Sequence, residues 1–225
     1  MKASSLAEMA YIAIKKDILT CRLAPGSQIA QSQLVERYEF GVTPIREALK
    51  RLESEDYLRS VPRFGYIINP ITIQDIEDIY ELRLLLETSA VRLAIQRGTD
   101  DDFARLKESA EFTYIFKDPD SYLEFLQHNI GFHVEVAALS GNRKLAEMLS
   151  AVLNEMTRIF NLGLDLRDSA EEMRREHQDL VEALIDRDEA GALQQITEQI
   201  QTSRQRVMEE FSERIDQRIM TGAAF

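Results

Sequence analysis

The chain has 225 residues, of which 44% are hydrophobic and 29% are charged, and its formal net charge is -12 at pH 7. This balance is ordinary for a globular protein and excludes a disordered chain. No apolar run approaches the roughly 20 residues that a membrane helix needs, and the N-terminus alternates apolar and charged residues, unlike a signal peptide. A single cysteine excludes an internal disulfide framework. We therefore expect a cytoplasmic protein without a membrane partner.

The acidic charge is unevenly distributed along the chain. Residues 1–73 contain ten Lys and Arg against eight Asp and Glu, a net charge of +2, and residues 74–225 contain 17 against 31, a net charge of -14. This asymmetry indicates two domains, and we place them at residues 1–70 and 71–225, with the boundary in "NPITIQD" at 69–75. Only the first domain has a charge that suits contact with a polyanion.

The first domain has the element order of a winged helix-turn-helix. Apolar residues recur at helical spacing in three segments, 4–20, 31–38 and 43–56. Two β-prone runs follow, over 58–61 and 66–68. The tip between these runs contains Pro62 and Gly65, which predicts a hairpin and completes the pattern.

The second domain is predicted to be helical almost throughout. Glycines, prolines and acidic capping residues separate its amphipathic segments. Six helices are expected, over 73–98, 99–117, 118–142, 143–163, 169–188 and 189–219. Short connections favour an antiparallel six-helix bundle, so the whole chain is predicted to be mainly α. The first of these helices is expected to bury one apolar face, made of Ile76, Ile79, Tyr80, Leu82, Leu86, Ala90 and Leu93.

The second helix of the helix-turn-helix carries residues that suit DNA. In this motif that helix enters the major groove with its N-terminal residues near the base edges. Thr43 can cap the helix, and the proline after it is tolerated in a first turn. Arg46 projects from that turn, where it can reach a guanine or a phosphate, and Lys50 follows on the same side. At the hairpin tip, Arg63 and Gly65 suit the minor groove or the DNA backbone.

The basic residues of this helix also have a structural interpretation. Surface ion pairs between residues one helical turn apart are common and contribute little to stability. Arg46, Lys50 and Arg51 can pair in this way with Glu47, Glu53 and Glu55. Charge alone does not separate this interpretation from DNA binding.

A longer ordered pattern favours DNA binding. The chain contains, in order, "PG" at 25–26, "LVERY" at 34–38, "TPIREALKRLE" at 43–53 and "RFGYII" at 63–68. Over roughly residues 6–70 it resembles the DNA-binding domain of the GntR family of bacterial transcription regulators. The resemblance implies DNA contacts by Ser32, Thr43, Arg46, Arg63 and Gly65. The family usually has Ser-Arg before its Thr-Pro, whereas this chain has Gly41-Val42, so one charge-assisted contact is replaced.

Two histidines of the second domain are candidates for a binding site. His133 and His177 lie on different predicted helices, each on an apolar face. Asn129 precedes His133 by four residues and so points from the same helix face, and Gln199 can join them from the last helix. His128 points elsewhere and is expected to be exposed. The structural interpretation is that each histidine is a hydrogen-bonded core residue.

The same domain resembles the FCD ligand-binding domain of the FadR-like subfamily of GntR regulators. The matching segments are "DIYELRLLLETSAVRLA", "NIGFHVEVAALSGN" and "EHQDLVEALIDRDEAGA", and six helices favour the VanR-like branch. Many FCD domains hold a metal with one Asp and three His, which correspond here to Asn129, His133, His177 and Gln199. Because divalent cations prefer anionic or imidazole ligands, we expect a metal-free pocket that binds an effector through these four side chains. A metal held by His133 and His177 is the alternative.

Arg83 is a further candidate for this pocket. The matching arginine of the family points toward the cavity, and its guanidinium suits a ligand carboxylate. The alternative is an ion pair with Glu87, four residues along the same helix. Arg158 is a second candidate cation. Small organic acids are the usual ligands of the family, so the resemblance implies a carboxylate effector.

These expectations combine into a homodimeric transcription regulator that binds double-stranded operator DNA. We expect a repressor, because repression is the commoner action in the family, and an effector that shifts the dimer between two states. A helical adaptor whose winged helix binds protein is the alternative that the Gly41-Val42 departure leaves open. An enzyme is not expected, because no nucleophile motif, phosphate loop or suitable carboxylate accompanies the histidines.

Overall fold

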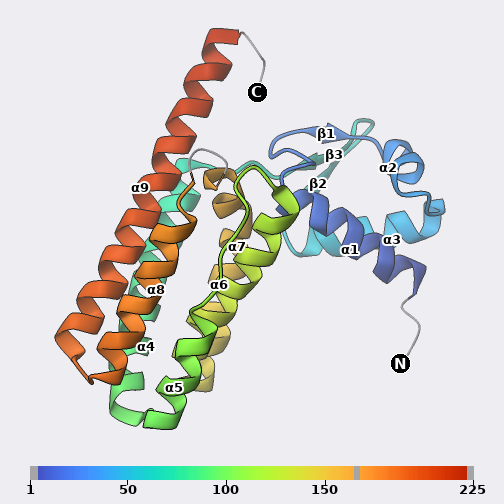
Figure 1. Ribbon diagram of the computed structural model, residues 1–225. Coiled ribbons are helices and arrows are strands. Elements are labelled where there is room, and N and C mark those ends of the chain that lie inside the picture. Colours follow the sequence, from blue (N-terminus) through green and yellow to red (C-terminus); the bar gives the residue numbers. More distant parts are fainter. Residues whose placement is uncertain (1–4, 165–167, 222–225) are drawn as a thin grey trace. The chain divides into compact units, whose positions relative to one another are not determined.

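A computed structural model describes residues 5–164 and 168–221, and the chain divides into two compact units, one up to Thr72 and one from Ile73 onward. Helices dominate both units, and a small antiparallel sheet belongs to the first (Figure 1). The predicted fold class is confirmed, since the first unit is a winged helix-turn-helix and the second is helical. None of the described helices is both long and apolar enough to cross a membrane.

The first unit alternates helices with short strands. In chain order these are α1 (Leu6–Leu19), β1 (Gln28–Ile29), α2 (Gln31–Tyr38), α3 (Val42–Ser54), β2 (Leu58–Val61) and β3 (Gly65–Ile68). β3 lies between β1 and β2 and pairs antiparallel with both. The sequence pattern does not predict β1, because two residues are too few to show alternation. β1 forms only because it pairs with β3, and in this pairing Gln28 lies opposite Ile67.

The beginning of α3 differs from the expected one. Gly41 is the N-cap residue and makes no side-chain capping bond, and Val42 is the first helical residue. The expectation that Thr43 caps this helix is therefore wrong. Pro44 still fits the first turn, because the N–H groups of that turn have no partner inside the helix.

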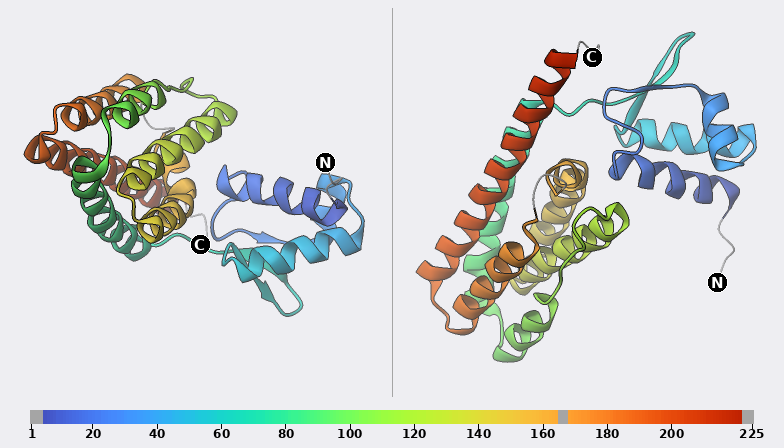
Figure 2. Two further views of the ribbon diagram at one scale, coloured as in Figure 1. Left: turned by 90° about the horizontal axis from the view of Figure 1, so that it is seen from below. Right: turned by 45° about the horizontal axis from the view of Figure 1, so that its top comes forward.

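A single apolar core holds the first unit together. Its α1 and α3 lie side by side (Figure 2), and α2 and the sheet complete the packing. On α3, the side chains of Ala48, Leu49 and Leu52 belong to this core. The other large contributors are Ile14, Ile18, Leu34, Ile45, Leu58 and Ile68.

The second unit contains six helices in the part that the structure describes, as expected. They are α4 (Ile73–Arg97), α5 (Asp100–Ser109), α6 (Pro119–Leu139), α7 (Arg143–Gly163), α8 (Ala170–Ile185) and α9 (Glu189–Thr221). α4 packs against α6, α7 and α9, and α8 packs against α9 (Figures 1 and 2). The side chains of Thr99, Asp118 and Asn142 cap α5, α6 and α7.

α5 ends at Ser109, although the sequence pattern predicts a helix that continues to Lys117. The segment "FTYIF" that follows is rich in aromatic and β-branched residues, which are weak helix formers. Tyr114 is also buried there. Its hydroxyl accepts a hydrogen bond from the Ser169 N–H at 2.8 Å, and its ring packs against Phe125. These tertiary contacts replace the last two turns of the predicted helix.

α4 buries only part of the expected face. Ile76, Ile79, Tyr80 and Ala90 are buried as predicted, but Leu82 is exposed, and Leu86 and Leu93 are only half-buried. Arg83 and Glu87 are buried instead. The buried face of α4 is therefore turned toward Arg83 and Glu87. A pattern of apolar residues does not predict this, because the two charges can be buried only as an ion pair with each other.

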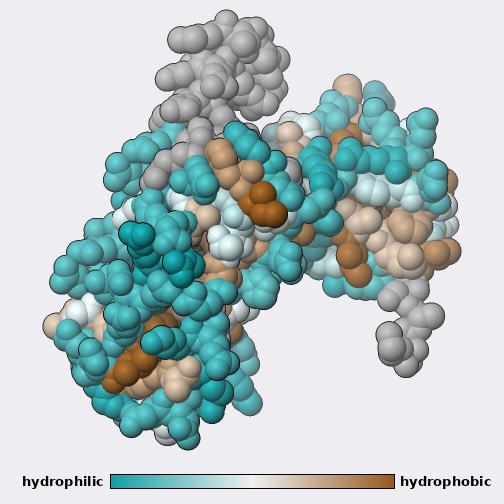
Figure 3. Space-filling model, in the orientation of Figure 1, coloured by the Kyte–Doolittle hydropathy of each residue, from teal (hydrophilic) through white to brown (hydrophobic). Residues whose placement is uncertain are grey.

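Hydrophilic side chains cover most of the face shown in Figure 3, and hydrophobic ones form only small patches on it. Large exposed hydrophobic residues occur on several elements. They include Val42 on α3, Phe64 between β2 and β3, Leu82 and Leu85 on α4, and Met148 on α7.

Candidate DNA-binding surface and effector site

The exposed side of α3 carries three of the predicted DNA contacts. Thr43, Arg46 and Lys50 are all exposed on this helix. Neither Arg46 nor Lys50 forms an ion pair with another residue in the described part of the chain. The structural interpretation, in which these cations pair with neighbouring glutamates, therefore does not hold for either of them.

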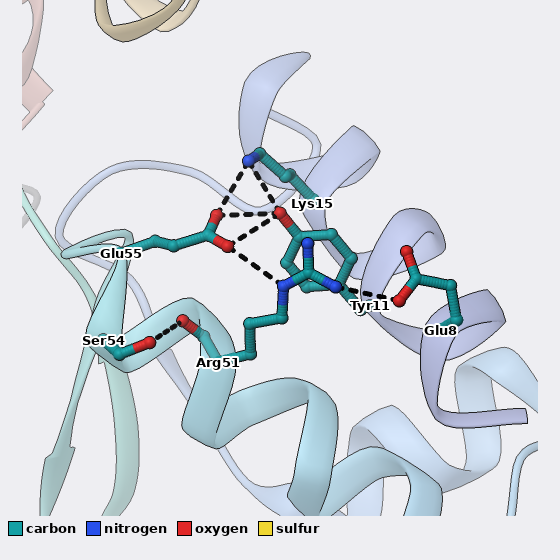
Figure 4. A network of polar contacts seen from close by, with 6 residues as sticks. All are labelled: Glu8, Tyr11, Lys15, Arg51, Ser54 and Glu55. Carbon is teal, nitrogen blue, oxygen red and sulfur yellow. Dashed lines mark hydrogen bonds and ion pairs between the residues drawn. The ribbon is translucent and has the colours of Figure 1, made fainter. Parts of the chain in front are cut away.

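Arg51 is different, because it belongs to a network that ties α3 to α1 (Figure 4). Its Nη1 donates to Glu8 at 2.8 Å and its Nε donates to Glu55 at 3.1 Å. The guanidinium also lies 3.6 Å from the ring centroid of Tyr11. Lys15 Nζ and the Tyr11 hydroxyl donate to the same Glu55 carboxylate, each at 2.8 Å. Burial tends to raise the pKa of Glu55, but these donors outweigh it and lower that pKa. For Arg51, therefore, the interpretation as a surface ion pair with glutamate holds.

The remaining predicted DNA contacts lie on α2 and at the hairpin tip. Ser32 is exposed on α2, and Arg63 is exposed at the tip. Gly65 has a φ of +91°, and a Cβ on it would lie 2.5 Å from the carbonyl oxygen of Ile29. Glycine is thus required where β1 approaches β3, a structural reason that is independent of DNA.

The five predicted effector residues are all buried in the second unit. Arg83 lies on α4, Asn129 and His133 on α6, His177 on α8 and Gln199 on α9. The histidine ring centroids lie 5.3 Å apart, and Nη2 of Arg83 lies 3.4 Å from Nε2 of His133. Three of the five are thereby brought into one polar cluster.

Arg83 is not a free cation in this cluster. Its Nε donates a hydrogen bond to Glu87, so the ion-pair alternative is present. Oε2 of Glu87 also lies 2.6 Å from Nδ1 of His133, and a hydrogen bond between these two side chains helps to keep the carboxylate ionised. Burial tends to raise the pKa of Glu87, but Arg83 and then His133 outweigh it and lower the pKa to about 2. The cluster therefore contains a carboxylate that balances the guanidinium.

His177 lies among aromatic rings. The ring centroids of Phe112 and Phe132 are each 4.8 Å from its own. Burial, followed by the nearby His133 and Arg83, holds the pKa of His177 well below its usual value. The ring is thus neutral at pH 7, with one nitrogen that can donate a hydrogen bond and one that can accept. The exposed His128 stacks against Phe112, with the two ring centroids 6.2 Å apart.

Several buried polar atoms of this unit have no hydrogen-bond partner within the described residues. They are Nδ2 of Asn161, one ring nitrogen of His177 and Oε1 of Gln199, whereas the other ring nitrogen of His177 interacts with the backbone of Met173. These atoms come from α7, α8 and α9. Each costs about 1–3 kcal/mol when it is left unpaired. Buried atoms of this kind are what a polar ligand would satisfy.

Sequence reasoning missed one buried polar residue of this unit, Asn161 on α7. It has no signal of its own, because a single amide in a helix is indistinguishable from a surface residue. Glu87 is expected from its spacing, since it lies four residues after Arg83, and the structure buries both of them. The second candidate cation, Arg158, is buried on α7.

The residues present do not fit a divalent metal. Within residues 5–164 and 168–221, no three His, Cys, Asp or Glu side chains are grouped as metal ligands. Asn129 and Gln199 supply only neutral amides, and the guanidinium of Arg83 lies 3.4 Å from Nε2 of His133. A second cation beside that nitrogen is electrostatically unfavourable.

Two family models match the chain. Residues 6–68 match the family described as bacterial regulatory proteins, gntR family, and residues 78–202, more than half of the chain, match the FCD domain. The chain belongs to the GntR family. This GntR-family regulator thus joins a DNA-binding unit to an FCD unit, the kind of domain that binds small-molecule effectors.

The GntR-family regulator has similar relatives in other bacteria. It is 31% identical over 189 residues to the uncharacterized HTH-type transcriptional regulator YdhC of Bacillus subtilis (strain 168), covering 83% of this chain and 84% of the relative. It is 28% identical over 190 residues to the HTH-type transcriptional repressor GlaR of Escherichia coli (strain K12), covering 81% and 86%. The matching families and relatives are transcription regulators, which confirms that this regulator is not an enzyme.

Solved structures share the fold of the GntR-family regulator. E. coli McbR/YncC superimposes with a TM-score of 0.68 and 22% identity, covering 93% of this chain and 100% of that one. A putative transcriptional regulator GntR from Rhodococcus sp. RHA1 superimposes with a TM-score of 0.65 and 17% identity, covering 92% and 99%. At these identities the likeness establishes the fold alone.

Proposed function

We propose that this regulator is a repressor that reads its operator through the N-terminal half of α3, in the bacterial cytoplasm. The observation that carries the proposal is that Arg46 and Lys50 are exposed on this helix and form no ion pair with the residues that the structure describes, whereas Arg51 is held by α1. A guanidinium near the start of such a helix can form two hydrogen bonds with guanine. Repression is proposed by analogy with GlaR, which is named a repressor.

The test compares Arg46→Ala with Arg175→Ala, which removes an exposed arginine of α8 and so the same charge. The probe is the consensus duplex that the full chain selects from a random pool. Loss of a bidentate base contact should weaken specific binding about 5- to 150-fold, while Arg175→Ala should stay within about twofold. Unchanged affinity of Arg46→Ala would contradict the assignment. Failure to select any duplex would favour the adaptor alternative.

We further propose that the effector is a small organic acid bound without a metal in the buried polar cluster of the FCD unit. The support is the cluster of Arg83, Glu87, His133 and His177, together with unpaired buried atoms elsewhere in the unit, among them the Asn161 amide as a donor and the Gln199 carbonyl as an acceptor. An acid that also carries a hydroxyl group supplies both kinds of partner. Arg83, already paired with Glu87, would orient the carboxylate rather than neutralise it alone.

Stabilisation of the protein by a panel of small hydroxy acids tests this site. A ligand at 100 times its Kd stabilises the folded state by about 2.7 kcal/mol, which raises Tm measurably. His177→Phe fills the same space without hydrogen bonds and should abolish the shift. His128→Phe, which changes an exposed histidine, is the matched control and should retain it. An acid that stabilises both variants equally binds elsewhere.

We also propose that the regulator acts as a homodimer. Helix-turn-helix dimers bind two half-sites about one helical turn of DNA apart, which requires a two-fold interface. Leu82 and Leu85 are exposed leucines three residues apart on α4, and Met148 is exposed on α7, which packs against α4. The unit leaves much of these apolar side chains exposed, so a second copy is the proposed partner.

A further inference from the structure

Val42 is an exposed apolar residue at the start of α3. Its side chain is 58% exposed, and it is not part of the apolar core of the first unit. The N-cap before it is Gly41, which has no side chain. Packing therefore does not explain why a valine occupies this position.

The position of Val42 places it with the proposed DNA contacts. Residues four apart on a helix lie on the same face, so Val42 and Arg46 are neighbours on the exposed side of α3. As the first residue of this helix, Val42 belongs to the part that approaches base edges in a helix-turn-helix.

We propose that Val42 is a specificity-determining residue that contacts the C5-methyl group of a thymine in the major groove. This proposal rests on the proposed reading of DNA by α3. The thymine methyl is the one apolar group on the major-groove edges of the bases, and an isopropyl group has no donor or acceptor for the others. An arginine at this position could reach guanine or phosphate, so the valine exchanges a possible charged contact for an apolar one.

The experiment uses the full chain and the consensus duplex that it selects from a random pool. Each thymine is replaced in turn by deoxyuridine, which differs only by the missing methyl group. Burial of one methyl-sized group corresponds to about fourfold in affinity. One uridine position in each half-site should therefore weaken the native chain about fourfold, at constant salt concentration.

The variant Val42→Ser completes a double-mutant cycle. It should bind the thymine duplex more weakly than the native chain, and it should not distinguish uridine from thymine at that position. Ile12→Ser, which removes an equally exposed apolar side chain from α1, is the matched control and should keep the native fourfold ratio. Equal melting temperatures of the three proteins establish that the fold is retained.

The outcomes separate this inference from the function on which it rests. Suppose that Arg46→Ala loses specific binding, but that at every position the change from thymine to uridine lowers the affinity of the native chain no more than it lowers that of Val42→Ser. The thymine contact is then wrong, and the DNA-reading role stands. If the selected duplex has no thymine within reach of the helix, the contact is likewise wrong. If no duplex is selected, both proposals fail.

Discussion

Arg83 and Glu87 lie one turn apart on α4 and form an ion pair that is almost completely buried, with 2% and 3% of their side chains exposed. Removing one partner leaves the other charge buried and unpaired. Glu87→Gln is therefore expected to lower the free energy of unfolding by about 3–5 kcal/mol, as measured by denaturant titration at pH 7.

The matched control is the double variant Arg83→Met, Glu87→Leu. A buried ion pair can often be replaced by apolar residues of similar volume at little cost, so the double variant should be more stable than Glu87→Gln. A loss below about 1 kcal/mol for Glu87→Gln would show that water reaches the pair. A double variant less stable than the single one would contradict the account of α4.

Because His177 is buried as a neutral imidazole, we expect the stability of the protein to fall at mildly acidic pH. The imidazole is neutral in the folded state because burial, with His133 and Arg83, lowers its pKa well below 6.5. In the unfolded chain it takes up a proton below about pH 6.5, so the unfolded state binds more protons there and stability falls as the pH falls. The loss should therefore grow steadily as the pH is lowered below 6.5.

Unfolding curves at several pH values measure this dependence. His177→Phe should remove it, because phenylalanine does not titrate, and His128→Phe should leave it unchanged. If the native chain and His177→Phe show parallel pH profiles in this range, another group causes the acid sensitivity.

Much of the first unit is predictable because its signals are local. The Pro25-Gly26 turn, the proline in α3 and the tip of the hairpin each restrict the backbone directly. β1 and the end of α5 are not predictable in this way. β1 depends on pairing with β3. The end of α5 depends on the hydrogen bond between Tyr114 and Ser169, which are distant in the sequence.

The effector site is predictable only in part, for a related reason. His133 and His177 stand out as polar residues on apolar faces, and Asn129 follows from helix spacing. The burial of Arg83 and Glu87 in place of Leu82 depends on how α4 is rotated against its neighbours. A rule that places leucines inside and charges outside cannot predict that rotation.

Metal content tests the proposal of a metal-free pocket. The native chain, purified without a chelator, should contain far less than one equivalent of metal, because amides and a nearby guanidinium are poor surroundings for a divalent cation. The variant Asn129→Asp, Gln199→His restores the ligand types that many FCD domains use, and it should take up zinc, nickel or manganese. A full equivalent of any of these metals in the native chain would refute the proposal.

Effector binding should be coupled to proton uptake. Arg83 and Glu87 already balance each other, and His177 is neutral, so an ionised acid would add an uncompensated charge to a buried cluster. Affinity should therefore rise as the pH is lowered from 8 to 6, by up to about tenfold per pH unit if one proton is taken up. Calorimetry in two buffers of different ionisation enthalpy counts the protons. An affinity that does not change with pH would mean that the charge is balanced by another group.

The exposed leucines of α4 predict the dimer interface. Leu85 is 60% exposed, and a glutamate there would bury a charge on each side of a two-fold contact. Leu85→Glu should therefore give a monomer in light scattering at micromolar concentration, with the fold retained by circular dichroism. Operator affinity should fall as well, because two linked readers bind adjacent half-sites far more tightly than one. Ile185→Glu, at an exposed position on α8, is the control and should stay dimeric; a dimeric Leu85→Glu would place the interface on another face.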